Sequence, residues 1–545
     1  MKTYNTQAAD QGPLTTAGAG YSRAGTSGGG GRSSMALEKI TADVVVVGGG
    51  GSGLAAAIEA ASLGRSVILV EKAEKLGGTT AFSVGSITAT NTPQQLRRGI
   101  LDSPQAHFED LKKFNAAAGL PDNDNLCRLL VENVPDTVRW LMSMGVEFHG
   151  PMNELPHRKP RMHLVLPNSR SYIFHLARRA HALGVQIRTS VRASNFLMHD
   201  DRVVGIRCET ADGALEVHAR GGVVLCSGDY AASEEKREQF LGAQLRTAIP
   251  VNINNTGDGH DMVEALGGKI LNRQHYLGGI RFQAPPPKWI HNLPPNRLLT
   301  RCMRFMLENL PGVIVRPFIM SFLTGILVPS PKLLQSGAIL VNRKGERFGD
   351  ELEKPGPRIA QQPDKLAYIA FDAKLAAKFS GWPNYVSTAP GFAYASVADY
   401  RRNRKDIFHE DSSIEGLAAK IGVPADVLAR TVAGYNESLT QAGTGDRMPM
   451  SQGPFIAIGP VRYMINFTDG GIAISDNLEV LGRDGQPVLG LYAAGNSGMG
   501  GVLLEGHGHH LGWAFTSGRL AGRKAAHNAV TSDLPEAANA QPPAH

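Results

Sequence analysis

A glycine-rich turn between a strand and a helix constrains this fold more than any other feature of the chain. Residues 42–47 contain four consecutive valines after Ala42-Asp43, which predicts a buried parallel strand. Gly48-Gly49-Gly50-Gly51-Ser52-Gly53 follows at once, and the alanine-rich segment 54–63 predicts a helix. A second apolar strand, 66–70, ends at Glu71. Together these segments predict a βαβ unit of about 30 residues.

The spacing of Gly48, Gly50 and Gly53 matches G-x-G-x-x-G, a turn that lets the backbone approach a pyrophosphate. The free N–H groups and the positive dipole at the start of the helix favour the same anion. Glu71 stands near the offset of about 20 residues expected for an acid that binds a ribose. The alternative, a glycine turn without a ligand, leaves this combined placement unexplained, so we predict a dinucleotide site.

A second glycine turn, Gly77-Gly78-Thr79-Thr80, lies just beyond Glu71. Its hydroxyl groups suit the flavin side of a longer dinucleotide, and a late strand-to-glycine pattern ends at Gly495-Asn496. The combined pattern predicts FAD rather than NAD. The residues expected to contact this cofactor are Gly48, Gly50, Gly51, Ser52, Gly53, Glu71, Lys72, Gly77, Gly78, Thr79, Thr80, Ser83, Val191, Ser227, Gly228, Gly495, Asn496 and Leu511.

These motifs resemble the FAD-dependent fumarate reductase/succinate dehydrogenase flavoprotein superfamily. The resemblance covers residues 40–525; it is strong at both ends, includes Tyr435-Asn436, and is poor over 278–335. It implies an α/β fold: a Rossmann-like FAD-binding domain in two segments, with an inserted α+β capping/substrate domain and hydride transfer at flavin N5. Some members tether FAD through a histidine near the second glycine turn. Residues 79–82 contain none, so we expect non-covalent FAD.

The same reasoning predicts the domain organisation. Segments 37–277 and 455–529 are expected to form the FAD-binding domain, and 278–454 the capping domain. The glycine- and serine-rich residues 1–36 and the small, polar residues 530–545 are expected to be disordered tails. Met35 is a candidate natural start, and the first residues lack the apolar core of a secretory signal.

Two positions separate the chain from the fumarate reductases it resembles. Those enzymes carry a histidine next to a Thr-x-Gly-Gly turn, where this chain has Asn466 and Phe467 before Thr468. They also carry an arginine that grips a substrate carboxylate, and His510 stands in its place. Both departures argue against fumarate as the substrate.

Residues 493–496, Ala-Ala-Gly-Asn, look more like the 3-ketosteroid dehydrogenase-like branch. Those enzymes use a tyrosine as base and a glycine N–H as the donor to an enolate oxygen. Here Leu504 replaces the tyrosine, whereas Gly508 matches the donor glycine. Another side chain must therefore move the proton, and the candidates in and near this stretch are Glu505, His507, His509 and His510. Each could instead be a structural polar group.

Three further segments admit two interpretations each. Residues 157–170, rich in His and Arg, either lead into the active site or form a solvated basic loop, and His163 is a reserve base there. Tyr394 is a candidate acid or enolate donor, although an aromatic residue is more often core. The basic and apolar stretch 297–328 is either cap core or a contact with a membrane surface or an apolar substrate.

Composition limits the partners. The net charge of +7 is small for 545 residues, and no basic stripe interleaved with aromatics is present, so we expect no nucleic acid. Cys127, Cys208, Cys226 and Cys302 are scattered, which predicts neither a metal nor a disulfide framework and fits the cytoplasm, with membrane association as an alternative.

Taken together, the sequence predicts an FAD-dependent oxidoreductase acting on CH–CH groups. We expect it to desaturate a bond next to a carbonyl in a hydrophobic steroid-like or alicyclic ketone, by α-proton abstraction and hydride transfer. A fumarate reductase-like reductase of an activated C=C acid is the alternative, and a non-catalytic FAD-binding partner protein is the second. No second dinucleotide motif is visible, so a quinone or an electron-transfer protein is the expected electron acceptor, with oxygen as a further option.

Overall fold

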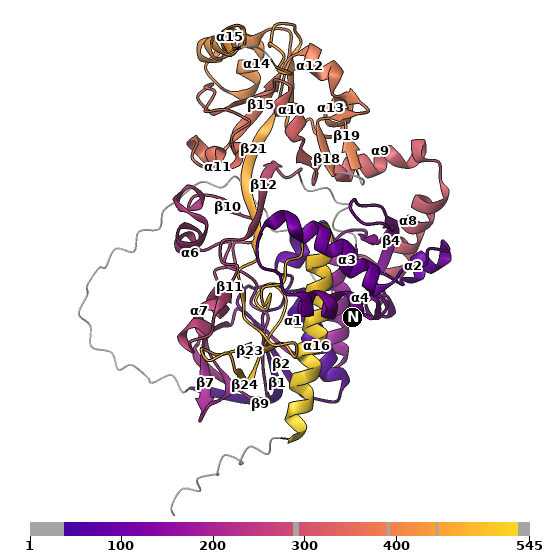
Figure 1. Cartoon of the computed structure of the whole chain (residues 1–545), viewed down its shortest axis with the longest axis vertical. Coiled ribbons are helices and arrows are strands. Elements are labelled where there is room, and N and C mark those ends of the chain that lie inside the picture. The colour runs from indigo at the N-terminus through magenta and orange to yellow at the C-terminus, as the bar shows by residue number, and fades with distance from the viewer. Residues whose placement is uncertain (1–36, 287–293, 390–392, 443–444, 532–545) are drawn as a thin grey trace, which may run out of the picture. The chain divides into compact units, whose positions relative to one another are not determined.

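The computed structural model describes residues 37–286, 294–389, 393–442 and 445–531 (Figure 1). The expected tail 1–36 lies outside these residues, as does 532–545. The last described helix, α16 (His509–Thr531), continues past Val530, at which we expected the second tail to begin.

An eight-stranded sheet carries the predicted βαβ unit. Its order is β23-β24-β8-β9-β1-β2-β6, and β7 pairs with β8. The central strand β1 runs parallel to both β2 and β9, and β24 also runs parallel to β9. Early and late segments of the chain thus share one sheet, which confirms the two-segment FAD-binding fold. The strands are β1 (Glu38–Val47), β2 (Val67–Glu71), β6 (Gln186–Thr189), β7 (Arg192–His199), β8 (Arg202–Thr210), β9 (Gly213–Leu225), β23 (Glu479–Leu481) and β24 (Pro487–Ala493).

Two helices pack closely beside this sheet. The helix α1 (Gly51–Ser62) lies against α16, seen in yellow in Figure 1. A Cβ at Gly518 would lie 2.3 Å from the Ser52 carbonyl oxygen, and one at Gly522 would lie 2.2 Å from that of Ala56. Only glycine permits this approach. The other elements of this part are α2 (Pro93–Arg97), α3 (Pro104–Asn115), α4 (Asp124–Ser143), α5 (Arg170–Ala182), α7 (Asp258–Ala265), β3 (Ser86–Thr88), β4 (Glu147–Met152) and β5 (Met162–Leu166).

A second, six-stranded sheet is built around the long strand β21 (Phe455–Thr468). Its other strands are β10 (Ile249–Pro250), β12 (Tyr276–Phe282), β14 (Ile339–Val341), β15 (Ala367–Phe371) and β20 (Phe408–Asp411). This sheet therefore takes strands from both sides of 278–454, so the exact domain boundaries remain a proposal. A small sheet of β13 (Val328–Pro329), β18 (Ser387–Ala389) and β19 (Ala393–Ala395) lies in the same lobe, as do α9 (Gly312–Leu323), α10 (Pro331–Gln335), α11 (Pro355–Ala360), α12 (Ala373–Lys378), α13 (Val397–Asn403), α14 (Ile414–Ile421) and α15 (Ala425–Ala442). The helix α8 (Arg297–Asn309) instead packs against β4 and β5 of the first part, where Arg304 pairs with Glu147.

The strand β9 runs unbroken through Gly221 and Gly222, because it pairs with β8 over 213–218 and with β1 over 215–225, with a register shift between Ala42 and Val44 of β1. The helix α9 continues through Pro317. Among the described residues, no helix is both long and apolar enough to cross a membrane.

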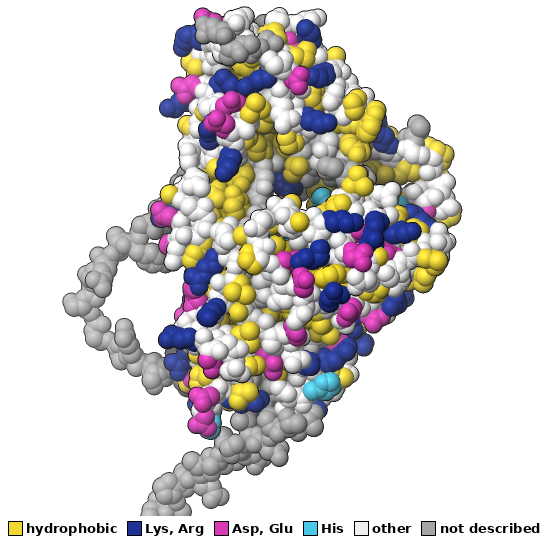
Figure 2. All heavy atoms as spheres, in the orientation of Figure 1, with side chains coloured by type: hydrophobic (Ala, Val, Ile, Leu, Met, Phe, Trp, Pro, Cys, Tyr) yellow, Lys and Arg dark blue, Asp and Glu magenta, His cyan; other side chains and the backbone are white. Residues whose placement is uncertain are grey.

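Charges of both signs are interspersed on the face of the molecule shown in Figure 2. No continuous basic stripe is visible there, consistent with the modest net charge of +7.

Candidate active site

The predicted phosphate turn is a compact loop at the start of α1. A Cβ at Gly53 would lie 1.8 Å from the Gly48 carbonyl oxygen, so the turn closes on itself. Gly50 differs: its backbone is extended, and a Cβ there would meet nothing nearer than the Gly78 Cα, at 3.8 Å. Gly50 is also the N-cap residue of α1 and brings no side-chain cap. The helix N-terminus therefore faces space that suits a phosphate.

Glu71 is held at this loop by backbone donors. Its Oε2 accepts from the Gly49 amide at 2.6 Å, and its Oε1 accepts from Ala73 at 2.8 Å. The Thr80 hydroxyl accepts from the Gly51 amide at 3.2 Å, which fastens the second glycine turn to the first. The carboxylate is thus fixed at the end of β2, where a ribose hydroxyl group would lie.

The late segment of the chain reaches the same place. A Cβ at Gly495 would lie 2.6 Å from the Ser52 hydroxyl oxygen. The hydroxyls of Ser227 and Ser497 are 3.2 Å apart, and Ser497 also donates to the Gly228 carbonyl at 2.9 Å. Motifs separated by more than 400 residues in the sequence therefore meet at one helix N-terminus, and this arrangement fits FAD.

Several predicted cofactor residues make protein contacts of their own. The Lys72 amine binds Asp258 at 2.7 Å, and the Thr79 hydroxyl accepts from Asn255 at 2.9 Å. The Val191 amide donates to the Glu71 carbonyl at 2.9 Å. Three more predicted cofactor residues also contact protein. The Ser83 hydroxyl donates to the Thr80 carbonyl, and the Asn496 side-chain amide lies 3.5 Å from the Thr468 carbonyl. Leu511 packs against the hydrophobic core. Lys72 has the weakest case for a cofactor role, because its charge is already paired.

Four side chains form a continuous acid–base cluster. Asp469 lies between two imidazoles, with Oδ1 2.9 Å from His510 Nε2 and Oδ2 3.4 Å from His275 Nε2. His275 Nε2 is also 2.8 Å from the Glu505 carboxylate. The Phe467 ring packs on His510 with ring centres 4.1 Å apart. We name His510, Asp469, His275 and Glu505 the relay cluster.

The hydrogen bond between His275 and Glu505 favours the charged form of both groups. The hydrogen bond from Glu505 raises the pKa of His275, and the same bond lowers the pKa of Glu505. Sequence reasoning missed His275 and Asp469, which come from distant turns before β12 and after β21. Asp469 occupies the variable position of the Thr-x-Gly-Gly turn, and no motif marked His275.

The other predicted catalytic residues lie elsewhere. His507 Nδ1 contacts Glu154 at 2.5 Å, and its side chain is 46% exposed. Gly508 lies against β3, where its carbonyl accepts from the Thr88 amide. His509 is fully buried, with its Nε2 3.1 Å from His107 Nε2 and its Nδ1 2.7 Å from the Glu505 backbone carbonyl. The Tyr394 ring packs beside those of Tyr385 and Trp382.

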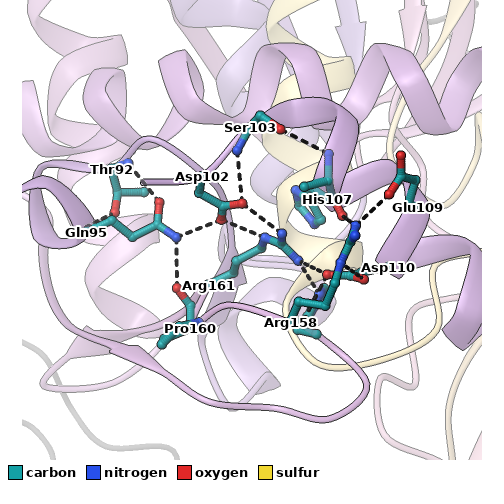
Figure 3. A network of polar contacts seen from close by, with 12 residues as sticks. Thr92, Gln95, Asp102, Ser103, His107, Glu109, Asp110, Arg158, Pro160 and Arg161 are labelled. Atoms are coloured by element: carbon teal, nitrogen blue, oxygen red, sulfur yellow. Dashed lines mark hydrogen bonds and ion pairs between the residues drawn. The ribbon is translucent and has the colours of Figure 1, made fainter. Parts of the chain in front are cut away.

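The solvated-loop interpretation of 157–170 holds for Arg158, Lys159 and Arg170, which are exposed, but not for the buried His157, Arg161 and His163. Arg161 is fully buried and forms ion pairs with Asp102 at 2.7 Å and Asp110 at 2.6 Å (Figure 3). Arg158 also pairs with Asp110, at 2.8 Å. These guanidinium groups are neutralised within the protein and are not available to grip an acidic substrate. His163 is buried too, with its Nε2 2.9 Å from the Thr92 hydroxyl.

Three buried imidazoles, His107, His157 and His509, adjoin this network. His107 Nε2 and His509 Nε2 are 3.1 Å apart, and Arg161 donates to His157 Nδ1 at 2.9 Å. His157 in its neutral form then carries its proton on Nε2 and has no lone pair left for a metal ion. Burial lowers the pKa of His107 far below its usual range, that of His157 to about 2 and that of His509 to about 4.

We predict that the protein loses stability as the pH falls from 7 to 5. The three imidazoles stay neutral when folded but bind protons below about pH 6.5 when unfolded. Protonation then favours unfolding, by up to about 1.4 kcal/mol per pH unit for each histidine. Denaturant titrations of the FAD-loaded protein at pH 7.0, 6.0 and 5.0 measure this slope. A denaturation midpoint that is independent of pH across this range would contradict the prediction.

Comparison with known proteins agrees with this geometry. A family described as FAD binding domain matches residues 43–291 and 297–504. The chain belongs to this family. It is an FAD-dependent oxidoreductase of the fumarate reductase/succinate dehydrogenase flavoprotein superfamily, as the sequence motifs predicted.

Relatives within the family are named for several reactions. The chain is 28% identical over 507 residues to a probable fumarate reductase Ifc3 of Shewanella frigidimarina, covering 90% of this chain and 76% of the relative. It is 26% identical to a 4-oxocyclohexanecarboxylate 2-dehydrogenase of Sinomonas cyclohexanicum, covering 90% and 94%. A solved flavocytochrome c3 fumarate reductase in its open conformation superposes with a TM-score of 0.68 at 26% identity, covering 90% of this chain and 79% of that one. Other relatives are named vinyl phenol reductase and urocanate reductase.

Proposed function

We propose that this enzyme desaturates a carbon–carbon bond next to the carbonyl group of an alicyclic or steroid-like ketone. The observation that carries the proposal is the His510–Asp469 pair. Because the Asp469 carboxylate accepts at Nε2, the neutral His510 ring keeps its lone pair on Nδ1, for which the described residues supply no partner. A carboxylate that orients an imidazole in this way produces a general base.

In the proposed reaction His510 removes the proton α to the carbonyl group. The Gly508 N–H is the proposed donor to the developing enolate oxygen, a role that resemblance assigned to this glycine. FAD, when bound, supplies the acceptor for the β-hydride. Asp469 would stabilise the imidazolium that forms on His510 through the 2.9 Å contact, and His275, 3.4 Å from the other Asp469 oxygen, would hold that carboxylate in place.

The cofactor is proposed to be held without a covalent bond by the residues gathered at the start of α1. Gly48, Gly50, Gly51, Ser52 and Gly53 would cradle the pyrophosphate, and Glu71 would bind the ribose. Residues 79–82, at the second glycine turn, are Thr-Thr-Ala-Phe and contain no histidine to form a tether.

The alternative is reduction of an activated C=C bond in an acid, which uses the same atoms in the opposite direction. Relatives named as reductases of fumarate and urocanate favour it. The relative named for 4-oxocyclohexanecarboxylate, a cyclic ketone, favours desaturation. The relay cluster also favours desaturation, since its four members are imidazoles and carboxylates without the arginine that clamps a dicarboxylate.

Electrons are proposed to leave to a quinone or an electron-transfer protein. The helix α8 offers a route to a membrane surface, because Leu298 and Phe305 are 82% and 63% exposed and are seven residues apart on one face. Arg297 and Arg301 lie on the same helix and would favour anionic lipids. This peripheral contact through 297–328 is part of the proposal.

The deciding measurement is steady-state oxidation with an artificial electron acceptor. Cyclohexanone, 4-oxocyclohexanecarboxylate, a steroid ketone and succinate would be compared at equal concentrations, with fumarate reduction measured in parallel. We expect at least one ketone to be oxidised faster than succinate. Succinate as the best substrate, or fumarate reduction faster than every ketone oxidation, would overturn the proposed direction and substrate class.

A further inference from the structure

Arg281, on β12, is a partly buried cation without a carboxylate partner in the described part of the chain. Its Nη1 donates to the Ile326 carbonyl at 3.1 Å and its Nη2 donates to the Asn466 side-chain oxygen at 3.2 Å. The Nε–H is buried and has no partner. Three other arginines, Arg161, Arg316 and Arg404, each pair with a carboxylate. A buried, unsatisfied donor on a cation indicates a missing anion or water.

The strand register places Arg281 on the side of the sheet that faces the relay cluster. Residues 277, 279 and 281 of β12 share one face because strand side chains alternate. Leu277 pairs with Phe467, the residue that packs on His510. The pairing then skips Asn466, which forms a β-bulge, and bulges re-aim side chains next to active sites. The bulge turns Asn466 toward Arg281.

The space between Arg281 and Phe467 is open. Gly279 is the residue between them on that face, and a Cβ there would meet no heavy atom within 4 Å. The opposite face is filled, since a Cβ at Gly278 would lie 2.8 Å from the Tyr463 hydroxyl oxygen. This face of β12 therefore has open space at Gly279, with Arg281 on one side and, on the other, Phe467, which packs on His510.

We infer that Arg281 and Asn466 form a subsite for a carboxylate group of the substrate, across the open face at Gly279 from Phe467 and His510. The inference rests on the proposed function and narrows its substrate class to an alicyclic ketone that also carries a carboxylate. Arg281 would hold the anion through its remaining N–H groups, and the Asn466 amide would add a neutral donor. Burial lowers the pKa of Arg281, as expected for a cation that lacks its counter-ion.

Equilibrium binding tests this inference without requiring turnover. Calorimetric titrations of the FAD-loaded protein would compare cyclohexanecarboxylate with its uncharged methyl ester. We expect the wild type to bind the carboxylate at least about 10-fold more tightly. Arg281→Gln should weaken carboxylate binding by about 10- to 100-fold and leave ester binding unchanged. Arg281→Lys should lose less than Arg281→Gln, because it keeps the charge but not the planar donor set.

Arg462→Gln is the matched control. Arg462 pairs with Arg281 across the two strands, but its guanidinium donates to the Asp364 carbonyl. The Arg462→Gln variant should bind the carboxylate and the ester with wild-type affinities. Flavin content and melting temperature would confirm that each variant is folded. Asn466→Ala provides a second test. It should weaken binding of the carboxylate but not of the ester, and by less than Arg281→Gln does.

Equal weakening of acid and ester binding in Arg281→Gln would show a structural role and overturn the inference. Equal losses of carboxylate affinity in Arg281→Gln and Arg462→Gln would also overturn it, because they would indicate long-range attraction by positive charge and not a specific subsite. The proposed function fails separately: a protein that binds the carboxylate through Arg281 but oxidises no ketone would retain the subsite and lose the desaturation.

Discussion

Replacing Gly50 with valine will abolish FAD binding in a protein that still folds. The expectation follows from the space around this residue, since a Cβ there touches the chain at ordinary contact distances of 3.8 Å or more. The backbone of Gly50 is extended, with φ of −79°, so a larger residue adopts it without strain. The added methyl groups would occupy the volume that the pyrophosphate needs.

The measurement is the flavin content of the purified variant after gel filtration, with circular dichroism to check folding. Gly50→Ala should show a weaker loss, because it adds one carbon and not three. The wild type should be yellow and should release its flavin on acid precipitation, as expected for non-covalent binding. A folded Gly50→Val variant with full flavin content would refute the assignment of the phosphate turn.

His510→Ala should lower the turnover rate by about 10²- to 10⁴-fold while FAD content stays normal. The reason is the loss of the imidazole lone pair that Asp469 orients through its 2.9 Å contact. Asp469→Asn should also reduce turnover, because an amide can present either an acceptor or a donor to the ring and no longer fixes one tautomer. Rates would be measured on the best ketone from the substrate panel.

Two comparisons make this result specific. Glu505→Gln should lower the rate less than His510→Ala, since Glu505 acts on the proposed base through His275 and Asp469. His507→Gln is the matched control, because His507 is half-exposed, contacts Glu154 and has no described contact with the relay cluster. If His510→Ala turns over at the wild-type rate, the base lies elsewhere and Glu505 becomes the first candidate.

The cofactor half of the site could be predicted from sequence because its information is local. Strand, glycine turn, helix and acid follow one another from 42 to 71, and their order alone places the glycines at a helix N-terminus. The catalytic half could not be predicted in the same way. His275 and Glu505 are 230 residues apart, and only the pairing of β12 with β21 brings the His275 turn beside Asp469.

Adjacent histidines show a second limit of sequence reasoning. His509 and His510 begin α16, and successive helical residues point about 100° apart. One ring therefore enters the buried imidazole group with His107, and the other meets Asp469. The sequence pattern marked both as catalytic candidates. Burial separates them, because a ring with its pKa held near 4 and no exposure is poorly placed to exchange protons with a substrate.

The close contact of α16 with α1 has a consequence for biosynthesis. The glycines at 518 and 522 lie directly on the backbone of the helix whose first turn is proposed to bind the cofactor. Until β24 and α16 have left the ribosome, the nascent first segment has an open sheet edge and a bare apolar helix face. FAD can then bind only after nearly the whole described chain has been synthesised. The cofactor would therefore bind to the finished polypeptide and not to the nascent one.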